Sequence, residues 1–517
     1  MRLIKPILIA SIALPTLFGQ VTNVQAASTT PLLDLWTDES ISKSSNPSDT
    51  YYLYRKPNKG AFFKNMYSGY TFYYPYAWKL DAHQIPNYAR LYHYNFRIDI
   101  TAQNTAKLYS TNAAYISKTT ADIKKYITKD SSWSKSNGKF RLVEYNRPVI
   151  KGISDDMNKY AYLFVEKGKV VYTFQLKTSD KHYAQKLKDL SYIASTFQAI
   201  TPKKFDLKKT TKLSNPDISY SYQGNSLRIP KNSFMMGLYT SKTRDVELLS
   251  SKLKSDIGSQ FFYKPIDSNF DSYTKELLNK KRLPVVTFLL EQGNGVKNPQ
   301  ITREIISGKY DTNIQNWAQE IKKLNGPVFI RFGNEMNGSW AQWGHQNNYN
   351  DPDLYKLAYR HFVDVFLKNN TKNAYFVWNP NISSSPNYEW NHATMYYPGD
   401  KYVDWIGLTA YNFGNGPFSR FVYFDSLYEN LYYDYSRAFS SKPMLIGEFG
   451  SVETGGSKAQ FISDFFAKIP TKYPNIKIAL WFSAKHDNYN FSVGTSQSSV
   501  NAFAKNMQNK NVIKGLK

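Results

Sequence analysis

The pattern of apolar and polar residues changes character near residue 226. Beyond that point, short and almost uninterrupted apolar runs alternate with stretches whose apolar residues recur at helical spacing. Uninterrupted apolar runs are typical of parallel strands that are covered on both faces. The predicted strands are Phe234–Tyr239, Ser259–Tyr263, Val285–Leu290, Val328–Phe332, Ala374–Trp378, Trp405–Thr409, Met444–Gly447 and Ile476–Trp481.

Amphipathic stretches of helical length separate these strands. They are predicted at Arg244–Leu253, Tyr273–Lys281, Ile314–Leu324, Tyr355–Leu367, Leu427–Phe439, Ala459–Ile469 and Val500–Met507. Eight strand and helix units over about 290 residues match the size of a (β/α)₈ TIM barrel. An open doubly wound sheet is the alternative, and it is disfavoured because no Gly-rich phosphate turn follows the first strand. The sequence therefore predicts an α/β domain with this barrel over residues 226–517.

Residues 51–201 show a different pattern, in which short β-rich runs are interrupted by helical stretches. The predicted strands are Tyr70–Pro75, Phe96–Ile100, Tyr160–Val165 and Val170–Leu176, and the predicted helices are Thr119–Ile127 and His182–Phe197. Strands grouped with helices on one side predict a small α+β sandwich. Residues 202–225 contain Pro202 and Pro216 among Lys, Ser, Thr and Asn, which predicts a linker to the barrel.

The N-terminus has the pattern of a secretory signal. A positive start at Arg2 precedes an apolar run, Pro6–Phe18, and a small-residue cleavage pattern, Val24–Ala26. We predict a signal peptide over residues 1–26 and a flexible polar lead-in over residues 27–50. An uncleaved anchor is disfavoured because nothing after the cleavage pattern stops transfer. We therefore expect a secreted protein, extracellular or cell-wall associated, with no transmembrane segment.

The chain contains no Cys and carries a formal net charge of +26, with the positive excess densest in residues 27–210. Disulfides are therefore excluded, and the folded cores alone must hold an exported chain. A basic exported protein is attracted to anionic polymers such as wall teichoic acid or acidic polysaccharide. A Lys-rich genome bias that only keeps the surface solvated is an equally good interpretation. Nucleic acid is disfavoured as a partner because the chain shows no nucleic-acid-binding motif.

Two of the predicted barrel strands lead directly to a glutamate. Strand Val328–Phe332 is followed by Glu335, and strand Met444–Gly447 is followed by Glu448. Active sites of such barrels lie at the carboxyl ends of the strands, so both side chains are expected at the mouth. Glycoside cleavage needs one protonated and one ionised carboxylate, and a separation of roughly 5–5.5 Å gives retention of the anomeric configuration. We therefore predict Glu335 as the general acid and Glu448 as the nucleophile.

A lone glutamate at a strand end is more often a solvated rim residue than a catalytic one. Together, the two glutamates favour a catalytic role. One follows the fourth strand in the sequence Asn-Glu, and the other follows the seventh strand in the sequence Gly-Glu-Phe-Gly. Arg331 and Tyr411 are predicted as donors that hold Glu448. Arg331 points to the same side of its strand as Glu335, toward the barrel interior. A purely structural salt bridge is the alternative for this arginine.

The motifs around these residues resemble those of glycoside hydrolase family 26, in clan A. The family's acid/base signature is similar to Arg331–Gly344, and further similarities follow in family order at Trp378–Asn381, Trp405–Tyr411, Ile446–Gly450 and Ala479–Phe482. The resemblance covers about residues 226–517. It implies an endo-acting, retaining hydrolase of a β-linked polysaccharide, most often β-mannan, that needs no metal or organic cofactor. Mixed-linkage β-glucanases and β-1,3-xylanases also occur in the family.

One departure from the family pattern concerns the substrate. Most family mannanases carry His directly before the acid/base glutamate, whereas this sequence has Asn334. In the wider clan, Asn at this place typically hydrogen-bonds the 2-hydroxyl of the sugar at the cleavage point. The resemblance therefore implies that Asn334 binds substrate and leaves mannan specificity open, because mannose and glucose differ at C2.

Five aromatic residues near the predicted mouth are candidate substrate contacts. The resemblance implies that Trp481 is the platform for the sugar ring and that Tyr411 positions the nucleophile. Trp340, Trp343 and Trp378 are predicted at flanking subsites, because the apolar face of a sugar stacks on an indole ring. Packing of loops over the barrel mouth is the alternative for each of these three tryptophans.

The N-terminal module resembles a PsbP/Mog1-like sandwich. The resemblance rests on Tyr73–Trp78 and on the closing helix that ends in Ser195–Phe197. It implies a binding or docking role and transfers no catalytic residue.

We therefore expect an exported two-domain enzyme that cleaves β-mannan, with mixed-linkage β-glucan or a bacterial exopolysaccharide as alternative substrates. Its expected partners are that polysaccharide and, through the basic module, an anionic cell-wall polymer. A different class of function is a non-catalytic polysaccharide-binding or surface protein on a degenerate barrel. That class is disfavoured because both glutamates are present.

Overall fold

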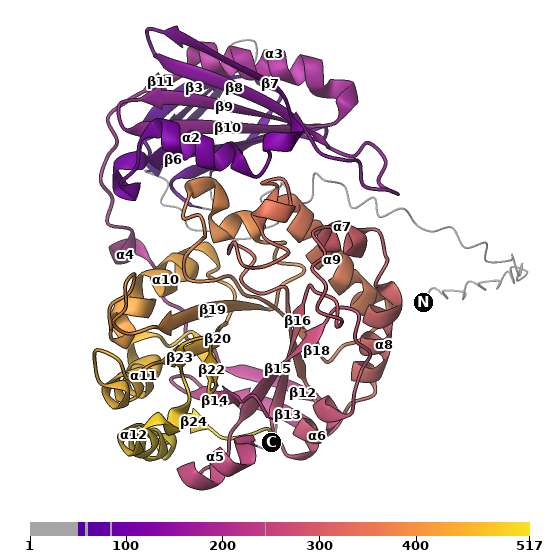
Figure 1. Cartoon of the computed structure of the whole chain (residues 1–517), viewed down its shortest axis with the longest axis vertical. Coiled ribbons are helices and arrows are strands. Elements are labelled where there is room, and N and C mark those ends of the chain that lie inside the picture. The colour runs from indigo at the N-terminus through magenta and orange to yellow at the C-terminus, as the bar shows by residue number, and fades with distance from the viewer. Residues whose placement is uncertain (1–49, 57–59, 83–84, 243–244) are drawn as a thin grey trace, which may run out of the picture.

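The computed structural model describes residues 50–56, 60–82, 85–242 and 245–517. The predicted signal peptide and almost all of the predicted lead-in lie outside the described residues. Figure 1 shows two parts, one above the other along the long axis. The upper part is a sheet-rich module formed by the N-terminal part of the chain, and the lower part is a barrel formed by the C-terminal part. Within the described ranges, we find no helix with the length and apolar character needed to cross a membrane.

The C-terminal part is a closed barrel of parallel strands, as the alternation of apolar runs and amphipathic stretches predicts. The first strand pairs in parallel with both the second and the last, and these pairings close the barrel. The strands are β14 (Phe234–Tyr239), β15 (Ser259–Pro265), β16 (Leu283–Leu289), β17 (Val328–Phe332), β18 (Ala374–Trp378), β19 (Trp405–Asn412), β20 (Met444–Ser451) and β21 (Ile476–Phe482). The prediction of a TIM barrel is confirmed.

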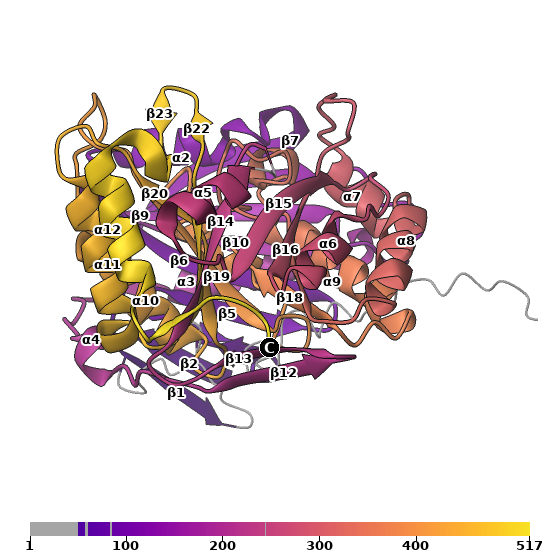
Figure 2. The same cartoon turned by 90° about the horizontal axis from the view of Figure 1, so that it is seen from below.

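Helices surround this barrel (Figure 2). They are α5 (Asp245–Leu253), α6 (Tyr273–Asn279), α7 (Ile301–Ile306), α8 (Asp311–Lys322), α9 (Pro352–Lys368), α10 (Phe424–Ala438), α11 (Lys458–Lys472) and α12 (Gln497–Met507). The sequence pattern missed α7, which is a short helix of six residues. The last strand, β24 (Val512–Ile513), pairs with β14 beside the barrel floor.

Two of the barrel strands that continue beyond their predicted ends carry predicted site residues. β19 runs on through Tyr411 and β20 through Glu448, and each contains an irregularity in its pairing register. One of the irregularities in the pairing of β20 with β21 falls between Ile446 and Phe449. An extra residue in a strand bends it and re-aims a side chain, so Glu448 lies within a strand rather than after it.

The segment predicted as a linker contains regular structure. It includes α4 (Leu207–Thr210), β12 (Ile218–Tyr222) and the start of β13 (Asn225–Ile229), and the two strands form an antiparallel hairpin. Tyr220 stacks on Tyr375 at a ring distance of 4.2 Å, next to the first residues of the barrel strands. The hairpin thus covers the floor of the barrel, opposite the mouth.

The N-terminal module is built from two antiparallel sheets. The smaller sheet has the order β1-β2-β3-β11 and the larger one the order β4-β5-β6-β10-β9-β8-β7. The strands are β1 (Tyr51–Lys56), β2 (Gly60–Asn65), β3 (Tyr70–Tyr74), β4 (Lys79–Asp81), β5 (Tyr88–His93), β6 (Phe96–Asn104), β7 (Ile127–Lys135), β8 (Gly138–Asn146), β9 (Lys159–Lys167), β10 (Val170–Thr178) and β11 (Gln198–Ala199).

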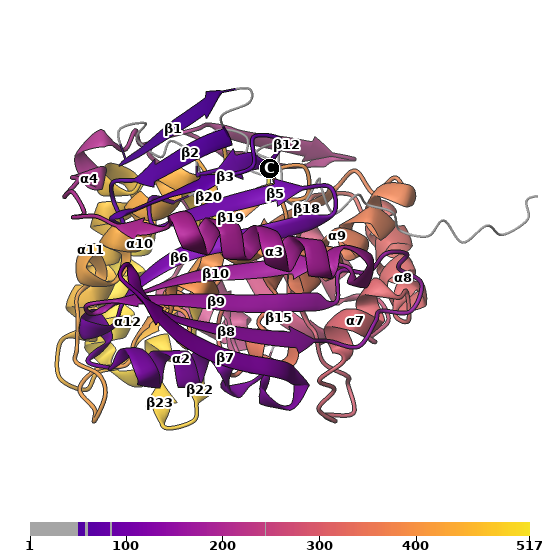
Figure 3. The same cartoon turned by 90° about the horizontal axis from the view of Figure 1, so that it is seen from above.

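Helix α3 (Asp180–Thr196) covers the face of the larger sheet that points away from the barrel (Figure 3). Its buried side chains, Leu190 and Ile193, pack in one core with apolar residues of both sheets. The shorter helix α2 (Asn112–Ala121) lies on the other side, toward the barrel (Figure 1). Strands and helices therefore form a small α+β module.

The other face of the larger sheet packs against the barrel. Tyr88, Tyr145 and Tyr162 on this face belong to the same buried apolar cluster as the barrel core. Successive residues of a strand point to opposite faces, so Phe174 and Leu176 of β10 enter the module's own core. The two parts therefore share a continuous apolar interface.

Buried charges also join the module to the barrel. The Lys177 ammonium donates to Asp351 at 2.6 Å and to Asp353 at 3.2 Å, and these two residues begin α9 of the barrel. Arg97 of β6 also pairs with Asp353, and Tyr160 donates to Asp351 at 2.6 Å. Charges buried at this depth need such partners because their hydration is lost.

We expect Lys177→Met to destabilise the protein by about 3–5 kcal/mol, because it leaves buried carboxylates short of a counter-charge. Lys159→Met is the matched control: Lys159 pairs with the exposed Asp180, and an exposed pair contributes at most about 1 kcal/mol. Urea unfolding of the two variants beside the wild type measures the difference. Equal losses in the two variants would contradict a buried electrostatic junction.

Candidate active site

Glu335 is presented by a strained turn directly after β17. Both Gly333 and Glu335 adopt left-handed backbone angles, with φ of 52° and 56°. A side chain at 333 would also meet Leu290 at 3.0 Å. The turn is held where the Glu335 amide donates to the Asn379 carbonyl at 2.7 Å. Left-handed angles at a residue other than glycine are uncommon and concentrate at functional sites.

Glu448 receives donors on both carboxylate oxygens. Its Oε1 accepts from Arg331 Nη2 at 2.6 Å and from Asn334 Nδ2 at 3.3 Å. Its Oε2 accepts from the Tyr411 hydroxyl at 2.8 Å. The side chain is buried, and the guanidinium compensates its negative charge.

Arg331 is fully buried in the barrel and directs its other donors to neutral partners. Its Nε donates to Thr287 Oγ1 at 2.8 Å, and its Nη1 donates to Asn379 Oδ1 at 3.0 Å. A Cβ at Gly447 would lie 1.8 Å from that Asn379 oxygen and 2.6 Å from Nη1. Glycine at 447 therefore leaves room for the Asn379 and Arg331 side chains.

The second carboxylate has a different environment. Burial and then the negative charge of Glu448 raise the pKa of Glu335 from its ordinary value of 4.5 to about 7. One donor opposes this shift, since Trp340 Nε1 donates to Glu335 Oε2 at 2.8 Å. Two carboxyl groups with such different surroundings can divide the tasks of proton donor and charged nucleophile.

Two phenols at the mouth stay protonated. Burial and then the charge of Glu448 raise the pKa of Tyr411 and of Tyr263 well above its ordinary value. Both hydroxyls are therefore available as donors beside Glu448. The sequence motifs identified Tyr411, whereas Tyr263 on β15 was missed.

Of the tryptophans predicted to contact sugar, Trp340 is exposed at the mouth, whereas Trp343 is buried. The Trp340 ring is 57% exposed at the mouth and touches Glu335, so it is placed to contact a ligand. Trp343 is buried and donates to the Asn334 carbonyl at 2.8 Å. It packs the turn that carries Glu335 rather than presenting a free ring face.

The predictions for Trp378 and Trp481 as sugar contacts are wrong. Trp378 is fully buried and packs against Tyr397 and Phe439, on the helix side of its strand. Trp481 is also fully buried, and its indole donates to the Phe491 carbonyl at 2.8 Å. In both strands the alternation of side chains turns the tryptophan away from the barrel interior.

The neighbours of these tryptophans face the interior instead. Asn379 follows Trp378 in the chain and accepts a hydrogen bond from Arg331 in the barrel interior. Phe482 follows Trp481 and also points inward. The Phe482 ring stacks on Tyr239 at 4.7 Å and meets Tyr411 edge-on at 6.0 Å. Phe482, rather than Trp481, therefore lies beside Tyr411 in the barrel interior. The sequence alone does not show which of these two neighbouring residues points inward.

The N-terminal module fixes the rim loop that carries Trp340. In this loop, Asn350 donates to the Thr119 carbonyl of the module at 2.7 Å. His345 lies 3.2 Å from Asp122 of the module and 3.1 Å from the Ser385 carbonyl of the next rim loop. The loops on this side of the mouth are therefore clamped between the barrel and the module.

In the part of the chain that the structure describes, no group of three or more His, Cys, Asp or Glu side chains could hold a metal ion. The polar groups at the mouth are instead carboxylates, amides, phenols and one guanidinium. Such a set can bind hydroxyl groups and exchange a proton with a substrate.

Residues 296–492 match the family model described as Glycosyl hydrolase family 26. The match includes both glutamates, and it confirms the resemblance indicated by the motifs. Endoglucanase H of Acetivibrio thermocellus is 34% identical over 194 residues, which are 36% of this chain and 20% of that protein. Mannan endo-1,4-beta-mannosidase of Bacillus subtilis strain 168 is 28% identical over 194 residues, 37% of this chain and 47% of that protein.

This chain therefore spans about a fifth to a half of the length of these curated relatives. Among solved structures, a GH26 beta-mannanase from Bacteroides ovatus is similar at 15% identity and a TM-score of 0.41. That similarity covers 55% of this chain and 90% of the other.

We expect Glu335→Gln to stabilise the protein, and to do so more at pH 8 than at pH 5. The folded state raises this pKa from 4.5 to about 7, so it binds more protons than the unfolded chain, and stability falls as pH rises through that window. The amide removes this loss, which is about 3 kcal/mol at pH 8, or a few °C in melting temperature for a chain of this length.

The melting temperatures of wild type and variant at the two pH values measure this effect. Glu276→Gln, at an exposed helical site, is the control and should show no such pH dependence. A gain of equal size at pH 5 and pH 8 would argue against a proton held on Glu335.

Proposed function

We propose that this chain, whose residues 296–492 match glycosyl hydrolase family 26, is a retaining, endo-acting hydrolase of a β-linked polysaccharide. One observation carries the proposal. The barrel mouth holds two glutamates, one with a pKa raised to about 7 and the other paired with a buried arginine. This is the asymmetry that acid-assisted displacement at an anomeric carbon requires.

In the proposed first step, Glu335 gives its proton to the glycosidic oxygen while a Glu448 oxygen attacks C1 of the sugar. The bond from C1 to the leaving sugar breaks, and a covalent glycosyl-enzyme forms. The leaving chain departs as an alcohol, and Glu335 remains as a carboxylate. Formation of the ester removes the charge of Glu448, so one of the two causes that raise the pKa of Glu335 is lost at that moment, while burial remains.

In the second step, the Glu335 carboxylate removes a proton from water, and the oxygen of that water attacks C1. The bond to Glu448 breaks, and both carboxyl groups return to their first state. Arg331 and Tyr411 support this step because they stabilise the carboxylate that leaves. Two displacements at C1 give net retention of configuration.

Asn334 is proposed to bind the sugar next to the attacked carbon. Its amide nitrogen donates to Glu448 at 3.3 Å. Its buried Oδ1 has no hydrogen-bond partner among the described residues, so a sugar hydroxyl that reaches it would find a free acceptor. Unpaired buried acceptors are costly, and a hydroxyl donor would satisfy this one.

β-Mannan is the first candidate substrate, supported by the family match and by the relative named as a mannan endo-1,4-beta-mannosidase. Mixed-linkage β-glucan is the second, supported by Asn334 in place of the histidine typical of family mannanases and by the relative named as an endoglucanase. A bacterial exopolysaccharide is a third candidate substrate. A non-catalytic polysaccharide-binding protein is the rival of a different class.

We expect the wild type to release reducing sugar from galactomannan or mixed-linkage β-glucan, in a panel that also contains glucomannan and β-1,3-xylan. Glu448→Gln should lower kcat by at least about 10³-fold, and Glu335→Gln by about 10²–10⁴-fold. Glu291→Gln, a partly exposed rim carboxylate, is the matched control and should retain turnover. A folded wild type that cleaves no polymer in the panel, or glutamate variants as active as the control, would contradict the proposal.

A further inference from the structure

The smaller sheet of the N-terminal module has one face in a core and one face toward solvent. Alternate residues of β2 and β3, among them Phe63, Phe72 and Tyr74, are buried in the module core. Their neighbours Phe62 and Tyr73 point the other way. The outer face is on the far side of the core from the larger sheet, which packs against the barrel.

This outer face is aromatic where a solvated sheet face is normally polar. Tyr73 is 46% exposed and Tyr52 is 51% exposed, and Phe62 lies between them on the neighbouring strand. The fold gains little from outward aromatic rings, since the core is built by the opposite face of the same strands. A group of exposed aromatic side chains marks a contact surface.

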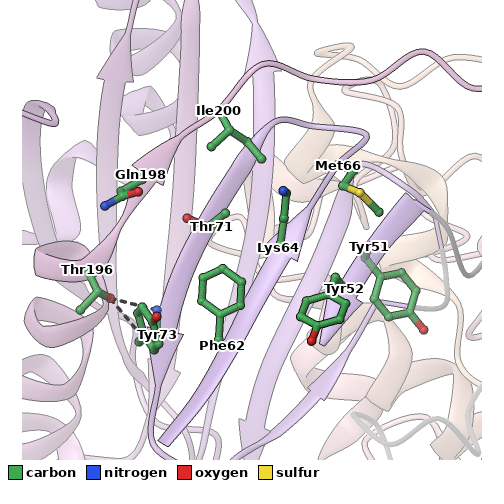
Figure 4. Close-up of a pocket in the computed structure, with 10 residues that line it drawn as sticks. All are labelled: Tyr51, Tyr52, Phe62, Lys64, Met66, Thr71, Tyr73, Thr196, Gln198 and Ile200. Carbon is green, nitrogen blue, oxygen red and sulfur yellow. Dashed lines mark hydrogen bonds between the residues drawn. The ribbon is translucent and has the colours of Figure 1, made fainter. Parts of the chain in front are cut away.

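The register of the strands arranges the outward side chains in two rows. Tyr73 is opposite Phe62, which forms an aromatic row, and Gln198, Thr71 and Lys64 are opposite one another in the row beside it. Figure 4 shows these side chains across the face of the sheet. They line an open hollow of about 670 Å³, together with Tyr51, Tyr52, Met66, Thr196 and Ile200.

The aromatic row is held in place before any ligand binds. The Phe62 and Tyr73 rings pack against each other, with their centroids 4.9 Å apart. β11 pairs with β3 over only two residues, and beyond them the Thr196 hydroxyl accepts from the Tyr73 amide at 3.0 Å. The backbone bond fixes the strand, and the ring contact restrains the two side chains, so they lose less conformational entropy on binding than free side chains would.

The charge of the hollow selects its ligand. The chain carries a formal net charge of +26, yet the described residues that line the hollow include one ammonium, Lys64, and no carboxylate. A polyanion would need several cations here, and a cationic ligand would need a carboxylate. A neutral polymer matches this charge. Apolar sugar faces stack on aromatic rings while the sugar hydroxyls bond to neighbouring polar side chains.

We propose that this face is a second, non-catalytic binding site for a neutral β-linked polysaccharide. The sugar faces stack on Phe62, Tyr73 and Tyr52, and the hydroxyls bond to Gln198, Thr71 and Lys64. The open shape of the hollow allows a polymer to pass across it. The site goes beyond the proposed hydrolysis: it holds the polymer class that the barrel is proposed to cut, and its binding needs neither glutamate.

The test compares wild type with Phe62→Ala/Tyr73→Ala in affinity electrophoresis through gels that contain galactomannan, glucomannan or mixed-linkage β-glucan. We expect at least one polymer to retard the wild type and the double variant to lose roughly 5-fold or more in affinity. Tyr94→Ala and Tyr109→Ala, exposed tyrosines elsewhere in the module, are the matched controls and should bind as the wild type does. Tyr52→Ala is the second variant, for use if the double variant does not fold.

Turnover of a short soluble oligosaccharide is measured in the same samples. We expect it to be unchanged in the Phe62→Ala/Tyr73→Ala variant, because the hollow lies away from the mouth. Equal retardation of variant and wild type overturns the second site, as does retardation by wall teichoic acid alone. Loss of oligosaccharide turnover alongside loss of binding also overturns it as a separate site. A wild type without hydrolytic activity would refute the proposed function alone, since retardation does not depend on cleavage.

Discussion

The buried ion pair between Arg331 and Glu448 determines how the rest of the barrel mouth is arranged. A guanidinium in a barrel interior needs polar partners, and here Thr287, Asn379 and Glu448 each accept from one of its three nitrogens. The same requirement explains the glycine at position 447, where any side chain would displace Asn379. Burial and then the negative charge of Glu448 raise the pKa of Glu335. The proposed division of roles between the two glutamates therefore rests on the depth of Glu335 in the mouth and on the arginine that holds its neighbour Glu448.

The N-terminal module belongs to the same physical unit as this mouth. Its larger sheet shares an apolar interface with the barrel, and Lys177 and Arg97 insert positive charge beside Asp351 and Asp353 at the start of α9. Some of the module's positive charges are therefore buried at its interface with the barrel instead of facing solvent. The rim loops that end near these residues are held by the module, while its smaller sheet remains free to meet solvent. One module can in this way support the mouth and present a separate surface.

The barrel could be predicted from the sequence because its strands are uninterrupted apolar runs separated by amphipathic helices. Glu335, Glu448, Arg331 and Tyr411 could be located because each lies at or near the end of such a run. Trp378 and Trp481 were misplaced because a strand end buried on both sides gives no signal for which of two neighbouring residues points inward. The charged positions of β6 and β10 alternate with apolar ones as in a solvated strand, so nothing in this pattern indicates that the barrel covers them. The hairpin under the barrel was hidden by its polar composition.

The central claim, that Glu448 is the nucleophile and Glu335 the acid/base, is tested most directly by azide rescue of Glu448→Ala and Glu335→Ala. The substrate is an activated aryl β-oligosaccharide of the sugar that the wild type cleaves, and NMR gives the configuration of the glycosyl azide. Without Glu448, azide itself must displace the aryl group, and the account predicts the α-azide. Without Glu335, azide attacks the covalent intermediate on Glu448, and the account predicts the β-azide. The opposite pair of configurations, or the same configuration from both variants, would contradict the assignment.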